Sequence, residues 1–211
     1  MSVLPKFDKA TAQGAQLPVG LLAGANVRTP CGPRRIENLR PGDLVVTRKD
    51  GLQPVRMIWK RTISASEVAA DPSLAPVVIA PRAVGPMMPQ AELRLAACHG
   101  ILLPGYRVEG MEDRDVCMIR ARDFEQKSDD VRHEKQKRDL VFYNLVFDTH
   151  QIFAANGLMV ESFLPTQTSI CGFKSEELDL LEEIVPGVAS GKADYPAVGL
   201  PVWDETAILA P

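Results

Sequence analysis

The stretch LVFYNLVFDTHQIFAANGLMVES, residues 140–162, decides the fold class of this 211-residue chain. Leu140 to Phe147 and Gln151 to Ala154 are short apolar runs, rich in the branched and aromatic residues that favour strands. Asn156-Gly157 indicates a two-residue type I′ turn, which needs positive φ at both positions, and Leu158 to Glu161 is then the returning strand. Successive hairpins of this kind predict a β-rich domain.

Further short runs upstream show the same pattern. Asn26 to Thr29 is predicted to be a strand that ends in the turn Pro30-Cys31-Gly32-Pro33, where two prolines and a glycine oppose regular pairing. Leu44 to Thr47 and Val55 to Lys60 are predicted to pair as a hairpin around Lys49-Asp50-Gly51. The remaining predicted strands are Pro76 to Ala80, Glu92 to Leu95, Ile101 to Leu103 and Val116 to Ala121.

Two polar segments interrupt or precede this pattern. Residues 1–18 are small and polar without a period, which predicts a flexible lead-in. The mixed-charge stretch SDDVRHEKQKRD, residues 128–139, has almost nothing to bury and is predicted to be an exposed loop between strands.

The end of the chain differs in composition. From Thr166 onward two lysines oppose eight acidic residues, which gives this part a charge of −6 and the rest of the chain +3. Ser175 followed by EELDLLEEI predicts a capped helix with acids in its first turn, and Pro186-Gly187 stops it. The irregular segment after it is expected to pack along the domain surface. The predicted division is therefore a lead-in over 1–18, one domain over 19–165 and an acidic extension with one short helix over 166–211.

Composition narrows the functional classes. With 24 Lys+Arg against 27 Asp+Glu the totals give no broad basic surface for nucleic acid. No long apolar run predicts a membrane-spanning helix or a conventional leader, so a cytoplasmic protein is expected, with leaderless export left open. The four cysteines are spaced 67, 19 and 54 residues apart, without a C-x-x-C pair, so they are expected to be free thiols. No metal or other cofactor is predicted.

Three segments together resemble the Hint superfamily of inteins and Hedgehog autoprocessing domains, and its bacterial Hint-domain proteins in particular. Gly20 to Thr29 followed by Ile36 to Thr47 is similar to the opening block with its E-x-L-x-x-G-D-x-V sequence. LRLAACH, residues 93–99, falls where the family carries T-x-x-H, and Tyr143 to Ser162 is similar to the closing block with Y-D-L, H-x-F and A-N-G. The resemblance implies a mostly β, compact, horseshoe-like and pseudo-two-fold fold, here with a short C-terminal helical extension.

The resemblance also implies which catalytic groups this chain lacks. In the family a leading cysteine attacks the preceding carbonyl carbon and converts the peptide into a thioester. That position corresponds to Gly20, which has no side chain. The Thr or Ser of the second block corresponds to Ala96, the Asp of Y-D-L to Asn144, and the terminal His-Asn of inteins to Glu161-Ser162.

Two histidines of the family pattern are kept. His99 corresponds to the histidine that supplies a proton to the departing amide nitrogen, and His150 belongs to the closing block. Cys98 is the thiol next to His99, but neighbouring residues of an extended segment point to opposite faces and would form no dyad. The candidate site residues are therefore Gly20, Ala96, Cys98, His99, Asn144 and His150. Without the family context, a histidine in a β-rich core is more often a hydrogen-bonded structural residue.

These observations favour a degenerate Hint-domain protein whose self-cleavage is lost or weak. We expect it to act as a binding or structural module, with the former active site accepting an extended peptide segment of itself or of another protein. One alternative is a working cysteine autoprotease that uses Cys31 or Cys98. A metal-binding β protein is the other alternative.

Overall fold

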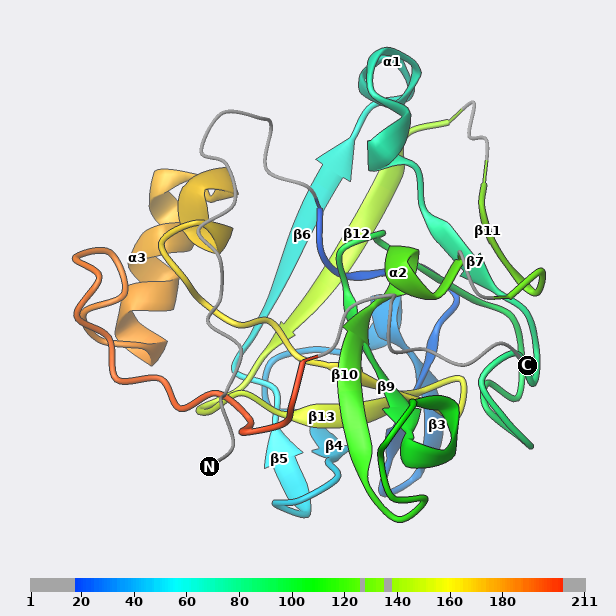
Figure 1. Cartoon of the computed structure of the whole chain (residues 1–211). Coiled ribbons are helices and arrows are strands. Elements are labelled where there is room, and N and C mark those ends of the chain that lie inside the picture. The colour runs from blue at the N-terminus through cyan, green and yellow to red at the C-terminus, as the bar shows by residue number, and fades with distance from the viewer. Residues whose placement is uncertain (1–17, 126–127, 135–137, 203–211) are drawn as a thin grey trace.

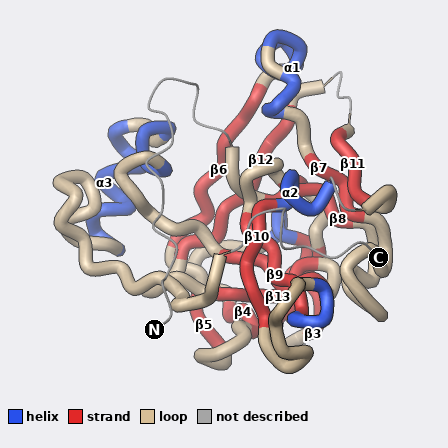
Figure 2. Tube along the Cα trace, viewed as in Figure 1, coloured by secondary structure: helices blue, strands red, loops and turns tan. Residues whose placement is uncertain are grey.

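A computed structural model of the chain describes residues 18–125, 128–134 and 138–202. Strands form the body of the molecule, while helix α1 lies at one tip and helix α3 lies to one side (Figures 1 and 2). This arrangement confirms the mostly β fold that the sequence predicts. The predicted lead-in falls almost entirely outside the described residues. None of the helices within the described ranges is long and apolar enough to cross a membrane.

The first six-stranded sheet positions the residues around Gly20. In spatial order its strands are β11 (Val131–His133), β7 (Val77–Ile79), β8 (Leu93–Leu95), β1 (Leu21–Leu22), β12 (Leu140–Val146) and β6 (Met57–Ile63). All of these pairs are antiparallel, and β12 and β6 pair over their whole length. Because β1 lies between β8 and β12, the residues just before β1 lie close to the end of β8 and to the middle of β12.

The second six-stranded sheet carries the closing hairpin. In spatial order its strands are β10 (Val116–Arg120), β9 (Gly100–Pro104), β14 (Leu158–Glu161), β13 (Ile152–Ala155), β2 (Asn26–Thr29) and β3 (Gly32–Arg35). Asn156 and Gly157 have φ angles of 48° and 85°, which confirms the turn predicted between β13 and β14. A separate hairpin pairs β4 (Leu44–Val46) with β5 (Leu52–Pro54).

The main core lies between the two large sheets. Its side chains come from both of them, including Val77 and Leu95 of the first sheet and Val27, Ile101 and Val160 of the second, all fully buried. Burial of each such side chain stabilises the fold by roughly 1.5–3 kcal/mol. Strands β8 and β14 alternate between more and less buried positions, which fixes their register, whereas β7 and β13 are buried at every position.

Three α-helices and four short 3-10 turns complete the described fold. They are α1 (Ala65–Ala70), α2 (Ala121–Glu125), α3 (Ser175–Ile184), η1 (Ile36–Asn38), η2 (Pro72–Leu74), η3 (Gly105–Arg107) and η4 (Ser169–Gly172). The bounds of α3 match the predicted helix, but Ser175 is its first helical residue and not its cap. The cap position is Lys174, whose backbone N–H donates to Glu177 over 2.9 Å.

The extension packs firmly on the β domain. The rings of Trp59 on β6 and Phe173 stack with centroids 4.1 Å apart, and Trp59 Nε1 donates to Glu177 Oε2 over 3.3 Å. Leu181 of α3 is fully buried in the same cluster, which also receives Val19. Part of the C-terminal extension therefore covers the segment that leads into Gly20.

Three local predictions were wrong. Gly32 and Pro33 belong to β3 and pair with β2, so the turn is confined to Pro30-Cys31. Proline is tolerated there because β3 is the edge strand, where a missing N–H donor disrupts no further pairing. The reversal at residues 49–51 exists, but β4 pairs with Leu52–Pro54, whereas residues 57–63 form β6 and pair with β12.

The third error concerns the mixed-charge stretch. Residues 131–133 of this predicted loop form the edge strand β11, which pairs with β7. Val131 is 3% exposed and joins the main core, so one apolar residue is enough to anchor the strand. Residues 135–137 lie outside the described residues.

Candidate functional site

The peptide bond between Val19 and Gly20 is surrounded by residues of the turn after β8 and of strand β12. Gly20 N–H donates to His99 Nδ1 over 3.1 Å, and Ala96 N–H donates to the Gly20 carbonyl over 2.9 Å. On the other side, Asn144 Nδ2 of β12 donates to the Val19 carbonyl oxygen over 3.1 Å. The structure thus brings four of the six predicted site residues together around one peptide bond.

His99 is an acceptor in this arrangement. Its ring is 3% exposed, and Nε2 has no hydrogen-bond partner among the described residues. Burial lowers the pKa of His99, although the nearby Glu161 carboxylate opposes the shift. A neutral ring with its proton on Nε2 fits the hydrogen bond that Nδ1 receives from Gly20.

Gly20 is glycine for a conformational reason as well as a chemical one. Its φ of +118° is a conformation that residues with a side chain rarely adopt. A Cβ atom placed there would lie 2.8 Å from Asn144 Nδ2 and 2.9 Å from the Tyr143 carbonyl oxygen. The position that would carry the nucleophile in an active family member therefore has no room for a side chain in this conformation.

Asn144 supplies a donor and no base. Its side chain is 2% exposed, and its amide group cannot take up a proton as a carboxylate can. The Nδ2 group points at the carbonyl oxygen that would become negatively charged during an attack on the Val19 carbonyl carbon. The amide nitrogen and the carbonyl oxygen of the Val19–Gly20 peptide bond are therefore both hydrogen-bonded, whereas Gly20 itself has no side chain.

Glu161 is a site residue that the sequence interpretation treated only as a lost histidine. Its Oε1 accepts the backbone N–H of Gly100 over 2.7 Å, and its Oε2 lies 3.4 Å from His150 Nε2. A Cβ on Gly100 would lie 2.6 Å from the Glu161 carboxyl group, so the glycine makes room for it. The signal in the sequence was a single carboxylate in the otherwise apolar strand LMVE.

The charges around Glu161 favour its ionised form. Burial alone would raise the pKa of this carboxyl group, but the contact with His150, the nearby His99 ring and the Gly100 N–H together hold the pKa below its usual range. Glu161 therefore contacts His150 directly and lies near enough to His99 for their charges to influence one another.

His150 faces the C-terminal segment on its other side. The residue is 4% exposed, and its ring Nδ1 accepts the backbone N–H of Val198 over 3.2 Å. The backbone N–H of His150 donates to the Pro196 carbonyl over 3.3 Å. His150 thus contacts Glu161 on one side and the C-terminal segment on the other.

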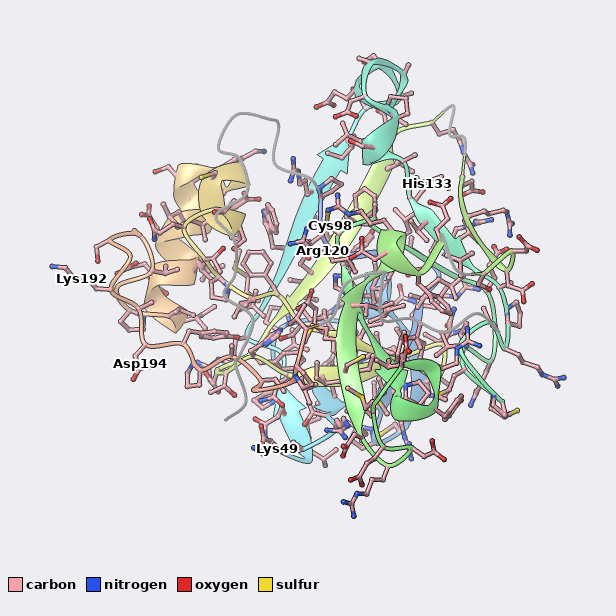
Figure 3. The ribbon with its side chains drawn as sticks, viewed as in Figure 1. Lys49, Cys98, Arg120, His133, Lys192 and Asp194 are labelled. Atoms are coloured by element: carbon pink, nitrogen blue, oxygen red, sulfur yellow. The ribbon has the colours of Figure 1, made fainter. Side chains whose placement is uncertain are left out.

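Cys98 lies in a turn rather than in an extended segment. The His99 N–H donates to the Ala96 carbonyl over 3.0 Å, which closes the turn between β8 and β9. Figure 3 shows Cys98 close to Arg120. Burial raises the pKa of the Cys98 thiol, opposed by the positive charges of Arg122 and Arg120. A raised pKa reduces the thiolate that a nucleophile needs.

The other thiols lie elsewhere. Cys31 is exposed in the turn between β2 and β3, and Cys171 is exposed on η4. Cys117 is buried in the main core, where burial raises its pKa to about 11. Within residues 18–125, 128–134 and 138–202, no group of three or more His, Cys, Asp or Glu side chains is arranged to hold a metal ion.

Comparison with protein families places this chain among the Hint domains. The Hint domain profile matches residues 19–167, which is more than half of the chain, and the chain belongs to this family. The resemblance stated from the three sequence blocks is thereby confirmed. No curated protein matches the chain.

Solved structures with a similar fold are inteins and an intein-like domain. The gp41-1 intein is 15% identical with a TM-score of 0.39, and the bacterial intein-like domain from Clostridium thermocellum is 12% identical with a TM-score of 0.39. In both cases the match covers 68% of this chain and 98% of the other. A splice-inactive variant of the AceL NrdHF class 3 split intein is 15% identical with a TM-score of 0.41, over 68% of this chain and 96% of that one.

Proposed function

We propose that this chain is a Hint-domain protein that has lost self-cleavage and uses the former cleavage site to hold its own peptide segment around Val19–Gly20. In this role the domain is a binding or structural module. The observation that carries the proposal is Gly20 itself, which lacks a side chain and has a φ of +118° with Asn144 and Tyr143 in the space of a Cβ.

The polar contacts at this peptide bond bind it but do not supply an attacking group. His99 and Asn144 interact with the amide nitrogen and the carbonyl oxygen on the two sides of the bond. Acyl transfer also needs a nucleophile aligned with the carbonyl carbon, at about 3–3.5 Å. Contacts that stabilise the intact peptide without a nucleophile strengthen binding and leave the reaction slow.

The residue before Gly20 adds apolar contacts to this binding. Val19 packs against the cluster that contains Trp59 of β6, Phe163 and Leu181 of α3. The held segment is therefore bound through its backbone by the β domain, and its Val19 side chain joins a cluster that the β domain and the C-terminal extension form together. A segment held by both backbone hydrogen bonds and apolar packing is typical of a structural element.

Intact mass spectrometry of the full-length chain tests the loss of cleavage. The purified chain is kept for several days alone, with dithiothreitol and with hydroxylamine, which intercepts thioesters. We expect the mass to stay unchanged under all three conditions. A fragment that begins at Gly20 would overturn the proposal.

The same measurement on cysteine variants separates the rival thiol chemistry. Cleavage that stops in Cys31→Ala or in Cys98→Ala would identify a working cysteine autoprotease. Cleavage that persists in both variants but stops in His99→Ala would show hydrolysis at the former site without a protein thiol. The binding part is checked by hydrogen exchange, in which the Gly20 amide is expected to be protected; rapid exchange of this amide would contradict a held segment.

A further inference from the structure

The segment Pro196 to Val202 crosses the surface between His150 and the edge strand β10. In Figure 1 this part of the chain, in orange to red, comes from the α3 side and turns upward beside β10. It has no helix or strand of its own. Its place is therefore set by what it contacts.

At one end the segment is bound by a buried polar residue. The Val198 N–H donates to His150 Nδ1 over 3.2 Å, and the Pro196 carbonyl accepts the His150 N–H over 3.3 Å. The His150 side chain is 2% exposed, and its Nε2 lies 3.4 Å from Glu161 Oε2. These two contacts bind the backbone of an extended peptide at the residues on either side of Ala197.

At the other end the segment joins the free edge of a sheet. β10 is the terminal strand of its sheet and pairs with β9 along one side only. On its other side the Met118 N–H donates to the Pro201 carbonyl over 2.9 Å, and Met118 forms a parallel bridge with Val202. Sheet edges with unpaired N–H groups bind extended peptides by this kind of strand addition.

The side chains of the segment alternate between inward and outward. Val198 and Leu200 are half-buried, whereas Gly199 and Pro201 are exposed. The apolar surface beneath the inward pair comes from β9, β10 and β13, namely Leu102, Met118 and Ile152. A tight turn at Gly199, closed by the Leu200 N–H and the Val198 carbonyl over 2.8 Å, carries the chain from His150 to β10.

We infer that this surface, called here the strap groove and formed by His150, Leu102, Met118 and Ile152, is a binding site for an extended apolar peptide. Its occupant in this chain is its own segment 196–202, bound as an intramolecular ligand that a peptide of the same kind replaces. The ligand class is a peptide with two branched apolar residues two positions apart and free backbone groups on either side. The inference does not depend on whether the Val19–Gly20 bond is cleaved.

The packing of the segment is loose enough for exchange. Val202 is 41% exposed, and a hollow of about 330 Å³ adjoins Leu200 and Pro201, so part of their surface has no packing partner. A single protein hydrogen bond makes only a small net contribution to stability, because water hydrogen-bonds the same groups in the open state. Segments held by few such contacts open at a small fraction of the free energy of global unfolding.

A binding experiment on the full-length chain tests the groove. The double variant Val198→Asp, Leu200→Asp places carboxylates against apolar surface and is expected to displace the segment. A fluorescent peptide YPAVGLPVW, residues 195–203, is titrated in fluorescence anisotropy. We expect it to bind the double variant at least 10-fold more tightly than the wild-type chain, because the wild-type groove is already filled.

Two controls define the specificity of that binding. Leu180→Asp, at an exposed leucine of α3, is expected to leave peptide binding as weak as in the wild type. The peptide with aspartate at both apolar positions is expected not to bind the double variant. Equal affinity of the peptide for wild type and double variant, or no binding to a double variant with unchanged circular dichroism, overturns the inference.

Hydrogen exchange of the wild-type chain tests the groove without relying on a folded variant. The amides of Met118 and Val198 are expected to be protected together and to open more readily than the amides paired between β12 and β6. An unprotected Met118 amide would mean that the groove is empty, and opening only with global unfolding would mean that the segment is not exchangeable. A wild-type dimer in sedimentation that the double variant abolishes would instead assign the segment to the groove of a second copy.

Discussion

The backbone N–H of Gly20 donates a hydrogen bond to Nδ1 of His99 over 3.1 Å, although 79 residues separate the two along the chain. The sheet order makes this contact possible, because β1 lies beside β8 and His99 follows β8 closely. A ring nitrogen that accepts from a backbone amide carries no proton of its own. The contact therefore ties the conformation at Gly20 to the neutral state of a buried histidine.

This relationship predicts a loss of stability on acidification. Burial lowers the pKa of His99 in the folded chain, so below the ordinary histidine pKa of about 6.5 the unfolded state binds a proton that the folded state does not. The contribution of neutral His99 to the free energy of unfolding should thus be complete above pH 6.5. It should decrease below this pH by up to about 1.4 kcal/mol per pH unit, until the folded pKa is reached.

Urea unfolding of the wild type and of His99→Gln between pH 7.5 and pH 5.5 measures this effect. Glutamine has a hydrogen-bond acceptor and does not titrate, so the variant should show a flatter profile over this window. Below about pH 4.3 the ionised Glu161, whose pKa is held low, should add a further decrease in both chains. Parallel profiles between pH 7.5 and 5.5 would contradict the assignment of a depressed pKa to His99.

A second prediction concerns the space at Gly20. Gly20→Ala combines an unfavourable φ of +118° with close contacts to Asn144 and Tyr143, and should lower the free energy of unfolding by about 3 kcal/mol. Gly24→Ala is the matched control, because its φ is +94° but no atom lies within 4 Å of an added Cβ. The control should cost only about 1 kcal/mol. Chemical denaturation that finds equal losses for the two variants would mean that the surroundings of Gly20 are not close-packed.

The local parts of the fold could be predicted from the sequence. The Asn156-Gly157 turn and the helix over 175–184 depend on neighbouring residues, and their signals are correspondingly clear. The pairing of β6 with β12 was missed because it joins residues about eighty positions apart. The apolar run after residue 54 was predicted to be the second strand of a hairpin. Its actual position depends on tertiary contacts, which bury Trp59 in a cluster with Leu181 of α3.

The candidate site divides in the same way. Family resemblance singled out Gly20, His99 and Asn144, and the structure brings these three residues together. Glu161 was not predicted as a contact of Gly100, since a carboxylate in a short strand gives no sign of what it faces. The contact of Val198 with His150 is likewise invisible in a proline-rich segment without a period.

A third prediction tests whether the acidic extension is part of the folded domain. Leu181 and Leu180 are adjacent on α3, but Leu181 is fully buried whereas Leu180 is 45% exposed. Leu181→Ala should lower the free energy of unfolding by about 2–4 kcal/mol, because it leaves a cavity beside Trp59 and Val19. Leu180→Ala should change it by less than about 0.5 kcal/mol. Thermal unfolding of both variants decides, and a stability of Leu181→Ala equal to wild type would mean that the extension unfolds independently.

The fourth prediction concerns Asn156, which holds the closing hairpin to two other segments. Its Oδ1 accepts the Asn26 N–H over 2.8 Å, and its Nδ2 donates to the Glu92 carbonyl over 2.7 Å. Asn156 as a whole residue is 8% exposed, so both partners would lose a buried contact if its side chain were removed. Each unsatisfied group costs about 1–3 kcal/mol.

Two substitutions separate the hydrogen bonds of Asn156 from its backbone conformation. Asn156→Ala loses both bonds and places alanine at a φ of 48°, and it should lower the free energy of unfolding by about 3–5 kcal/mol. Asn156→Gly loses the same bonds without the conformational penalty, so it should be about 1 kcal/mol more stable than the alanine variant. Asn38→Ala, at an exposed asparagine, should stay within about 0.5 kcal/mol of wild type. Urea unfolding of the three variants measures these differences; a wild-type stability in Asn156→Gly would show that the two side-chain bonds contribute nothing, and the hairpin would then depend on its turn conformation alone.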